Sequence, residues 1–112
     1  MQRLDVEFFR KDERGSLTQV NTGLWKQANI LDIRRDSSFG GHYHKEKEEL
    51  FYVISGRVQV LVENKDSATT MDFESGECFL IEPMDKHTIY GIEDSVLVEM
   101  LSEPFSEEDT FK

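Results

Sequence analysis

Residues 50–62 read Leu-Phe-Tyr-Val-Ile-Ser-Gly-Arg-Val-Gln-Val-Leu-Val, two apolar runs separated by a Ser-Gly pair. In the second run Val58, Val60 and Val62 alternate with mostly polar neighbours, which is the pattern of a strand with one buried face. The first run, residues 50–54, is apolar at every position, as in a strand that is covered on both faces. The segment therefore predicts two consecutive β-strands joined by a tight turn.

Short runs of the same kind recur along the whole chain, most of them about 4 to 8 residues long, which is strand length. Clusters of Gly, Asp, Asn, Ser and Pro separate them, and no window keeps the apolar spacing of a helix over 10 or more residues. We therefore expect an all-β fold, a sandwich or a barrel. The apolar or β-branched runs are 4–9, 17–20, 24–33, 50–54, 58–62, 68–73, 78–81, 88–92 and 96–101. The turn clusters are 12–15, 36–41, 55–56, 64–66, 74–76, 83–86 and 93–94.

Length and charge limit the function classes. The chain has 112 residues, which predicts one domain over residues 1–112, with a barrel at about 24–101 and an acidic tail at about 102–112. Asp and Glu number 23 against 13 Lys and Arg, for a formal net charge of -10, so we expect neither nucleic acid nor an anionic membrane as a partner. The composition of the tail predicts a frayed end, although Phe105 and Phe111 offer apolar groups that dock on a neighbour.

The single cysteine, Cys78, excludes an intrachain disulfide and indicates a reducing compartment. The first ten residues carry four charges, and no stretch approaches the roughly 20 apolar residues of a membrane span. We therefore expect a cytoplasmic protein. Because a small domain gains stability from association and strand edges need covering, we also expect a homodimer.

Three histidines offer a metal site. His42 and His44 are two residues apart, which places them on one face of a strand, and His87 follows far downstream. Together with Glu48 or Glu49 they would form a shell of nitrogen and oxygen without sulfur, which suits Zn, Fe, Mn, Co, Ni or Cu rather than Ca or Mg. Each feature taken alone has a simpler interpretation. A His-x-His pair on a solvent-exposed strand is more typical of a surface without a metal, and a lone histidine is typical of a core residue with a backbone hydrogen-bond partner.

Two segments resemble the motifs of the cupin family. Residues 41–56, Gly-His-Tyr-His-Lys-Glu-Lys-Glu-Glu-Leu-Phe-Tyr-Val-Ile-Ser-Gly, are similar to the first motif, in which His-x-His is followed by three or four residues, a Glu, six residues and a Gly. Residues 76–87, Gly-Glu-Cys-Phe-Leu-Ile-Glu-Pro-Met-Asp-Lys-His, are similar to the second motif. The departures from the family pattern fall at turns: Glu82 stands at the usual Pro, Met84 replaces a Gly, and Asp36 stands at the first-motif Gly.

The resemblance implies a single-domain cupin, an all-β double-stranded β-helix of the jelly-roll type. It also implies that His42, His44, Glu49 and His87 are the metal ligands. The choice of Glu49 over Glu48 rests on the family spacing, since both glutamates share a face with apolar residues of the following strand.

Four protein ligands in an octahedral shell leave two positions for a small-molecule substrate. Residues 93–99 are similar to barrels of the phosphomannose isomerases, and residues 14–17 to the start of sugar-nucleotide ketoisomerases. These similarities imply a carbohydrate or sugar-phosphate isomerase or epimerase. The alternatives are an Fe(II)-dependent dioxygenase, a non-catalytic binding or sensor protein, and a metal-free epimerase with His42 or His44 as its base.

The sequence identifies no catalytic acid or base. Four residues near the motifs are candidates, although each is more typical of a packing or rim position. They are Tyr52, Tyr90, Lys86 and Arg34.

Overall fold

The Ser55-Gly56 turn joins two strands, β6 (Glu49–Ser55) and β7 (Arg57–Asn64), as the sequence predicts. In the computed structural model, which describes residues 1–112, these two strands enter different sheets. Gly56 has a φ of 89°, and a Cβ at this position would lie 2.3 Å from the Ser95 Oγ, so only glycine fits the corner between the sheets.

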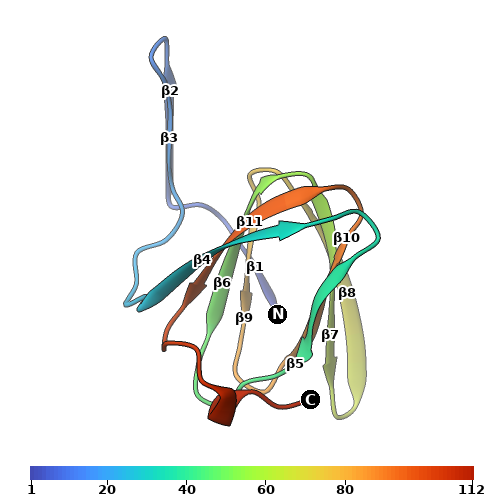
Figure 1. Ribbon diagram of the computed structural model, residues 1–112. Coiled ribbons are helices and arrows are strands. Elements are labelled where there is room, and N and C mark those ends of the chain that lie inside the picture. Colours follow the sequence, from blue (N-terminus) through green and yellow to red (C-terminus); the bar gives the residue numbers. More distant parts are fainter.

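Two antiparallel sheets face each other across the core (Figure 1). One has the strand order β1-β9-β6-β11-β4 and the other the order β5-β10-β7-β8. The expected all-β fold of the jelly-roll type is thereby confirmed. The remaining strands of the first sheet are β1 (Gln2–Leu4), β4 (Gln27–Ile33), β9 (Cys78–Ile81) and β11 (Ser95–Leu101). Those of the second are β5 (Ser38–His42), β8 (Ser67–Glu74) and β10 (Lys86–Gly91).

Alternating side chains of both sheets fill the space between them. The valines of β7 are buried, which confirms the inward face that their alternation predicts. Phe79 stacks on Phe51 at 4.9 Å and on Phe73 at 4.4 Å between ring centroids. The core therefore holds both sheets together through aromatic contacts, and Phe51 also forms a wall of the cavity described below.

The sequence predicts a turn over residues 36–41, but strand β5 begins at Ser38. β5 pairs with β10, and Gly40 adopts a φ of 105° there. A Cβ on Gly40 would lie 2.5 Å from the His87 carbonyl oxygen, so the glycine permits a close approach of the two backbones beside His87. The glycines that indicate a turn are thus part of an irregular edge strand.

The C-terminal segment is not frayed, contrary to the prediction. The backbone N–H of Phe111 donates to the Tyr43 carbonyl at 3.0 Å, and the Tyr43 N–H donates to the Phe111 carbonyl at 2.9 Å. Their rings stack at 5.3 Å, and a short 3-10 helix, η1 (Glu107–Asp109), precedes this contact. The segment therefore lies across the end of β5 (Figure 1).

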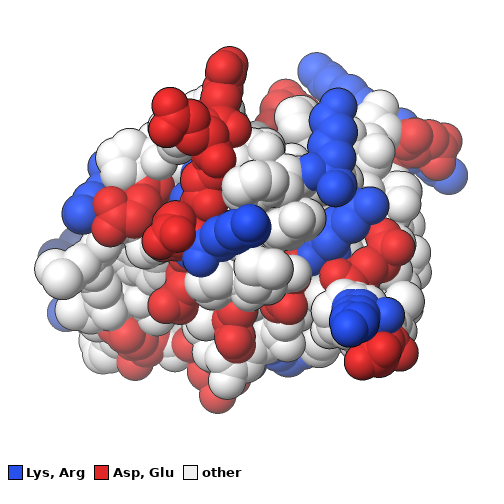
Figure 2. Space-filling model, turned by 90° about the horizontal axis from the view of Figure 1, so that it is seen from below, with Lys and Arg blue, Asp and Glu red and all other residues white.

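A hairpin of β2 (Phe8–Asp12) and β3 (Gly15–Gln19) extends away from the two sheets (Figure 1). The sequence predicts one strand over residues 4–9, whereas the chain leaves the first sheet after β1 and begins β2 at Phe8. No helix in the structure has the length and apolar character needed to cross a membrane. Figure 2 shows the molecule from below relative to Figure 1, and acidic and basic side chains are interspersed over this face.

Candidate metal centre

His42, His44, Glu49 and His87 converge at one end of the barrel. His42 ends β5, Glu49 begins β6, and His87 lies on β10 directly opposite His42 in the strand register. One potential ligand atom from each residue lies within 4.8 Å of the others. Bonds from zinc to nitrogen or oxygen ligands are about 2.0–2.2 Å long, so atoms at this separation can converge on one ion after a small inward movement.

The sequence predicts that His42 and His44 lie on one strand. The structure does not confirm this prediction, because β5 ends at His42. His44 lies beyond the bridge between Tyr43 and Phe111, yet its ring centroid is 4.8 Å from that of His42. The structure also separates the two adjacent glutamates: Glu49 is 2 % exposed within the cluster, whereas the side chain of Glu48 is exposed to solvent.

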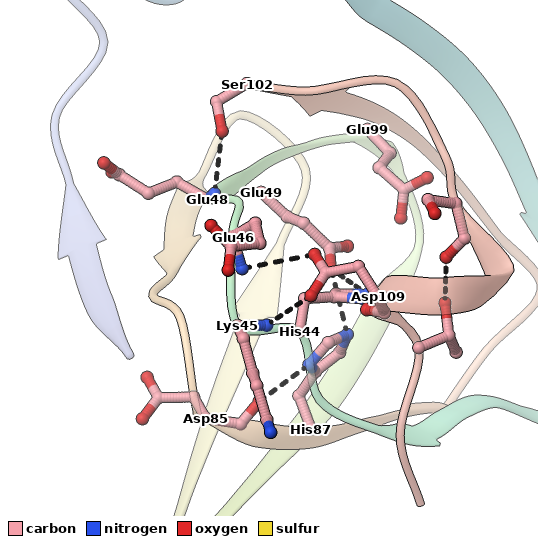
Figure 3. Close-up of polar contacts among 12 residues, drawn as sticks. His44, Lys45, Glu46, Glu48, Glu49, Asp85, His87, Glu99, Ser102 and Asp109 are labelled. Carbon is pink, nitrogen blue, oxygen red and sulfur yellow. Dashed lines mark hydrogen bonds and ion pairs between the residues drawn. The ribbon is translucent and has the colours of Figure 1, made fainter.

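Backbone carbonyls orient two of the imidazoles (Figure 3). The Nδ1 of His44 lies 2.7 Å from the Asp109 carbonyl oxygen, and the Nδ1 of His87 lies 3.1 Å from the Asp85 carbonyl oxygen. A carbonyl oxygen only accepts, so each Nδ1 carries the hydrogen and donates it. Both Nε2 atoms therefore face the cluster with a lone pair, the arrangement that orients histidine ligands in metal sites.

The Oε1 atom of Glu49 is buried and receives no hydrogen bond. It lies 2.7 Å from the His44 Nε2 and 3.6 Å from the His87 Nε2, neither of which has a hydrogen to give when the ring is neutral. A buried acceptor without a donor is costly. A cation bound between these atoms would satisfy the oxygen and both nitrogens, so the residues present fit a divalent metal.

Burial lowers the pKa of His42 to about 4, and the neighbouring His87 and His44 lower it further in the same direction. Burial also lowers the pKa of His87, and this effect outweighs the opposing attraction of Glu49. Both rings are therefore neutral at pH 7 and keep a nitrogen lone pair for a ligand bond.

The pKa values of His44 and Glu49 shift in opposite directions because the two groups attract each other. Burial alone would lower the pKa of His44, but Glu49 and the Asp109 carbonyl stabilise its charged form, so the pKa is raised. Burial alone would raise the pKa of Glu49, but His44 and His87 lower it. Glu49 is thus an anion that attracts positive charge to the space beside the His44 Nε2.

A cavity of about 240 Å³ opens beside the four residues. Six apolar side chains and eight polar or charged ones line it. None of the four candidate acid–base residues lines the cavity. The lining residues are Gln27, Asn29, Leu31, Phe39, Gly40, His42, His44, Lys47, Glu49, Phe51, His87, Ile89, Glu99, Leu101 and Phe105.

Sequence reasoning misses a polar chain along one wall of this cavity. The Phe105 N–H donates to the Gln27 Oε1 at 2.9 Å, the Gln27 Nε2 to the Asn29 Oδ1 at 3.1 Å, and the Asn29 Nδ2 to the Glu99 Oε1 at 2.8 Å. Glu99 interrupts the apolar run 96–101, which is the only sequence signal of its inward position.

Glu99 lies beside Glu49 on the cavity wall (Figure 3). Burial raises the pKa of Glu99 to about 7, assisted by the charge of Glu49 and opposed by the hydrogen bond from Asn29. The cavity therefore contains one carboxylate that belongs to the histidine cluster and one carboxyl group outside it.

The fold is that of several solved sugar-processing enzymes. The sugar 3,4-ketoisomerase QdtA from Thermoanaerobacterium thermosaccharolyticum has a TM-score of 0.86 at 19% identity, over 97% of this chain and 85% of that one. The TDP-fucose-3,4-ketoisomerase WlaRA from Campylobacter jejuni has a TM-score of 0.85 at 16% identity, over 99% and 89%. The dTDP-4-dehydrorhamnose 3,5-epimerase from Sulfolobus tokodaii has a TM-score of 0.79 at 19% identity, over 91% and 70%. At these identities the likeness is one of fold.

No curated protein matches the sequence of the chain. The family model described as "Cupin domain" matches residues 30–102, a span that contains both motifs and all eleven residues of the buried hydrophobic core cluster. The motif resemblance, the paired sheets and this match agree, and the chain belongs to the cupin family.

Proposed function

We propose that His42, His44, Glu49 and His87 hold a divalent transition metal (Zn, Fe, Mn, Ni, Co or Cu) and that the protein is a metal-dependent isomerase or epimerase of a carbohydrate or sugar phosphate. The observation that carries the proposal is the buried Glu49 Oε1, which faces the Nε2 atoms of His44 and His87 without a hydrogen-bond donor. Three nitrogens and one oxygen without sulfur suit this group of metals.

A metal bound there supplies Lewis-acid polarisation of a carbonyl or hydroxyl oxygen. Glu99 is the group of this chain that can exchange a proton with a neighbouring carbon, because it lines the cavity and lies outside the four ligands. The amide of Asn29 fixes its carboxyl group by donating to Oε1.

The size of the cavity and the fold relatives support a carbohydrate substrate. About 240 Å³ is below the roughly 300–1,000 Å³ of cavities for drug-sized ligands, so the cavity suits a molecule of monosaccharide size. The named relatives are two sugar ketoisomerases and a sugar epimerase, and one of them, QdtA, is described in complex with TDP and, as a mutant, with TDP-4-keto-6-deoxyglucose.

Elemental analysis of untagged protein after metal supplementation tests the metal site. We expect about one ion per chain. Activity is measured separately, by incubating the protein with a panel of aldoses, ketoses and sugar phosphates in deuterated water. We expect a carbon-bound hydrogen of the substrate to exchange with deuterium. A chelator should abolish the exchange, and the metal should restore it. Far less than one ion per chain would overturn the metal site and favour the metal-free epimerase.

A dioxygenase is the second candidate, because the donor set with three histidines and one glutamate also suits Fe(II). An isomerase keeps its activity under anaerobic conditions, whereas an oxygenase does not. A sugar that raises the melting temperature without turnover under either condition would favour a binding or sensor protein.

Replacing Glu99 tests its role in proton exchange. We expect Glu99→Gln to lower the exchange rate by about 100-fold or more, since an amide cannot transfer the proton, while the metal content stays at that of the wild type. Glu93→Gln, in the exposed turn before β11, is the matched control and should leave the rate unchanged. An unaltered rate in Glu99→Gln would remove Glu99 from the mechanism.

We also propose that residues 1–112 act as one domain, since β1 pairs with β9 and so joins the sheet that carries Glu49. A cytoplasmic location is proposed on the basis of the single, buried and unpaired Cys78.

A further inference from the structure

Lys47 is buried inside the protein without a partner for its charge. It lies in the segment between His44 and Glu49 and is 3 % exposed. No carboxylate oxygen lies within 4.0 Å of its Nζ, and no hydrogen bond from it is formed within the chain. Its nearest recognisable contact is the ring of Phe105, whose centroid is 5.4 Å from the Nζ, at the outer limit of a cation–π interaction.

Lys26 and Lys45, by contrast, have a charged partner or are exposed to solvent. The Nζ of Lys26 donates to both carboxylate oxygens of Glu103 at 3.0 and 2.9 Å, and Lys45 is exposed and lies over Phe111. Lys47 lines the cavity, and an ammonium there that forms no ion pair or hydrogen bond with the protein can pair with an anion that enters the cavity. The position of Lys47 therefore allows it to bind an anion from outside the chain.

The cavity is the place where that anion would bind, because Lys47 lines it together with the histidine cluster. Neither carboxyl group of the cavity forms an ion pair with Lys47: Glu49 faces His44 and His87, and Glu99 accepts from Asn29. A negative group of a bound molecule can thus reach Lys47 without competition from a side chain of the protein.

We infer that Lys47 binds the carboxylate of a small hydroxy- or keto-acid, so that the substrate class is a sugar acid. A carboxylate suits the site better than a phosphate. The cavity is small, no arginine lines it, and Lys47 supplies the only ammonium there, whereas phosphate sites gather several donors. This inference rests on the proposed function, since it names the substrate class of the same site.

Binding of an acid and its isosteric amide to the zinc-loaded protein tests the inference. We expect wild-type protein to bind D-glucuronate at least about 10-fold more tightly than D-glucuronamide in a calorimetric titration, because the charge-assisted bond to Lys47 forms with the acid alone. Lys47→Gln should reduce this preference to near unity while it leaves the affinity for the amide unchanged. Lys47→Arg should keep part of the preference, and Lys45→Gln, the exposed control, should keep all of it.

Failure of the inference is distinguishable from failure of the proposed function. Zinc content is measured on every variant, and a wild type that holds zinc yet binds the acid no better than the amide, or binds neither, overturns the sugar-acid inference alone. A preference that persists in Lys47→Gln also overturns it. A wild type without metal overturns the metal site, while loss of the preference on going from wild type to Lys47→Gln still supports the carboxylate site.

Discussion

Glu49 is the residue on which the candidate metal centre depends most, because it is the only anion that faces the three imidazoles. We expect Glu49→Gln to weaken zinc binding by at least about 10-fold, since an amide oxygen carries no charge to hold the ion. Competition with a chromogenic chelator measures the affinity. Glu48→Gln is the matched control, because its side chain is exposed to solvent.

The opposite outcome, with Glu48→Gln weakened and Glu49→Gln unchanged, would contradict the assignment. The alternation of side chains along the strand does not distinguish these two glutamates, since the residues that share a face with either of them are apolar. The structure separates them through the start of β6, where Glu49 pairs with Ile81 and Leu101 and turns inward. At this scale the sequence predicts the type of ligand and only the family spacing predicts which residue supplies it.

Among the elements, the C-terminal segment contacts the site most directly. The Asp109 carbonyl accepts from the His44 Nδ1, and the Asp109 carboxylate accepts from the backbone N–H groups of Lys45 and Glu46 at 2.9 and 3.2 Å. One residue of the segment therefore holds both the ring of a proposed ligand and the chain that follows it (Figure 3).

We expect Asp109→Ala to weaken zinc binding by about 10-fold, because residues that orient metal ligands carry effects of about 10 to 100-fold. Asp109→Asn keeps a side-chain acceptor and should recover part of the affinity. Glu107→Ala, in the same 3-10 helix but without these contacts, should bind zinc as the wild type does. Equal affinity in wild type and Asp109→Ala would show that the carboxylate contacts of Asp109 do not position His44.

The strands differ in how far the sequence predicts them. The alternation in β7 and the uniform apolar run in β6 identify both strands and their buried faces, because these faces are set by local periodicity. Strand β5 and the C-terminal segment escape prediction for a different reason. More than half of their residues are glycine, serine or acidic, and their positions come from contacts that β5 makes with His87 and that the C-terminal segment makes with Tyr43 and His44, far away in the sequence.

The projecting hairpin dominates the shape of the whole molecule (Figure 1). Phe8 and Leu17 are 48% and 49% exposed, and they lie on one face of the hairpin, since Leu17 pairs with Arg10. An isolated two-stranded hairpin is marginally stable in water, so this face needs a covering surface. A second copy of the chain is the expected partner, in line with the homodimer that the small size of the domain predicts.

We expect the protein to have the mass of a dimer in light scattering at micromolar concentration, and Phe8→Ser/Leu17→Ser to have that of a monomer, because the substitutions remove the apolar face. Ile54→Ser, at an exposed apolar position outside the hairpin, is the control and should stay dimeric. A wild-type monomer, or a dimer that survives the double substitution, would rule out the hairpin as the interface.

Strand β11 lies between β6 and β4 in the middle of its sheet, although it is the last strand of the chain. During synthesis β4 leaves the ribosome long before β11, and β11 is its only neighbour in the sheet. Residues 27–33 therefore have no strand to pair with in this sheet until translation has reached residue 101. The first sheet therefore cannot be completed stepwise from the N-terminus, and the edge of β4 is open to mispairing until β11 has been made.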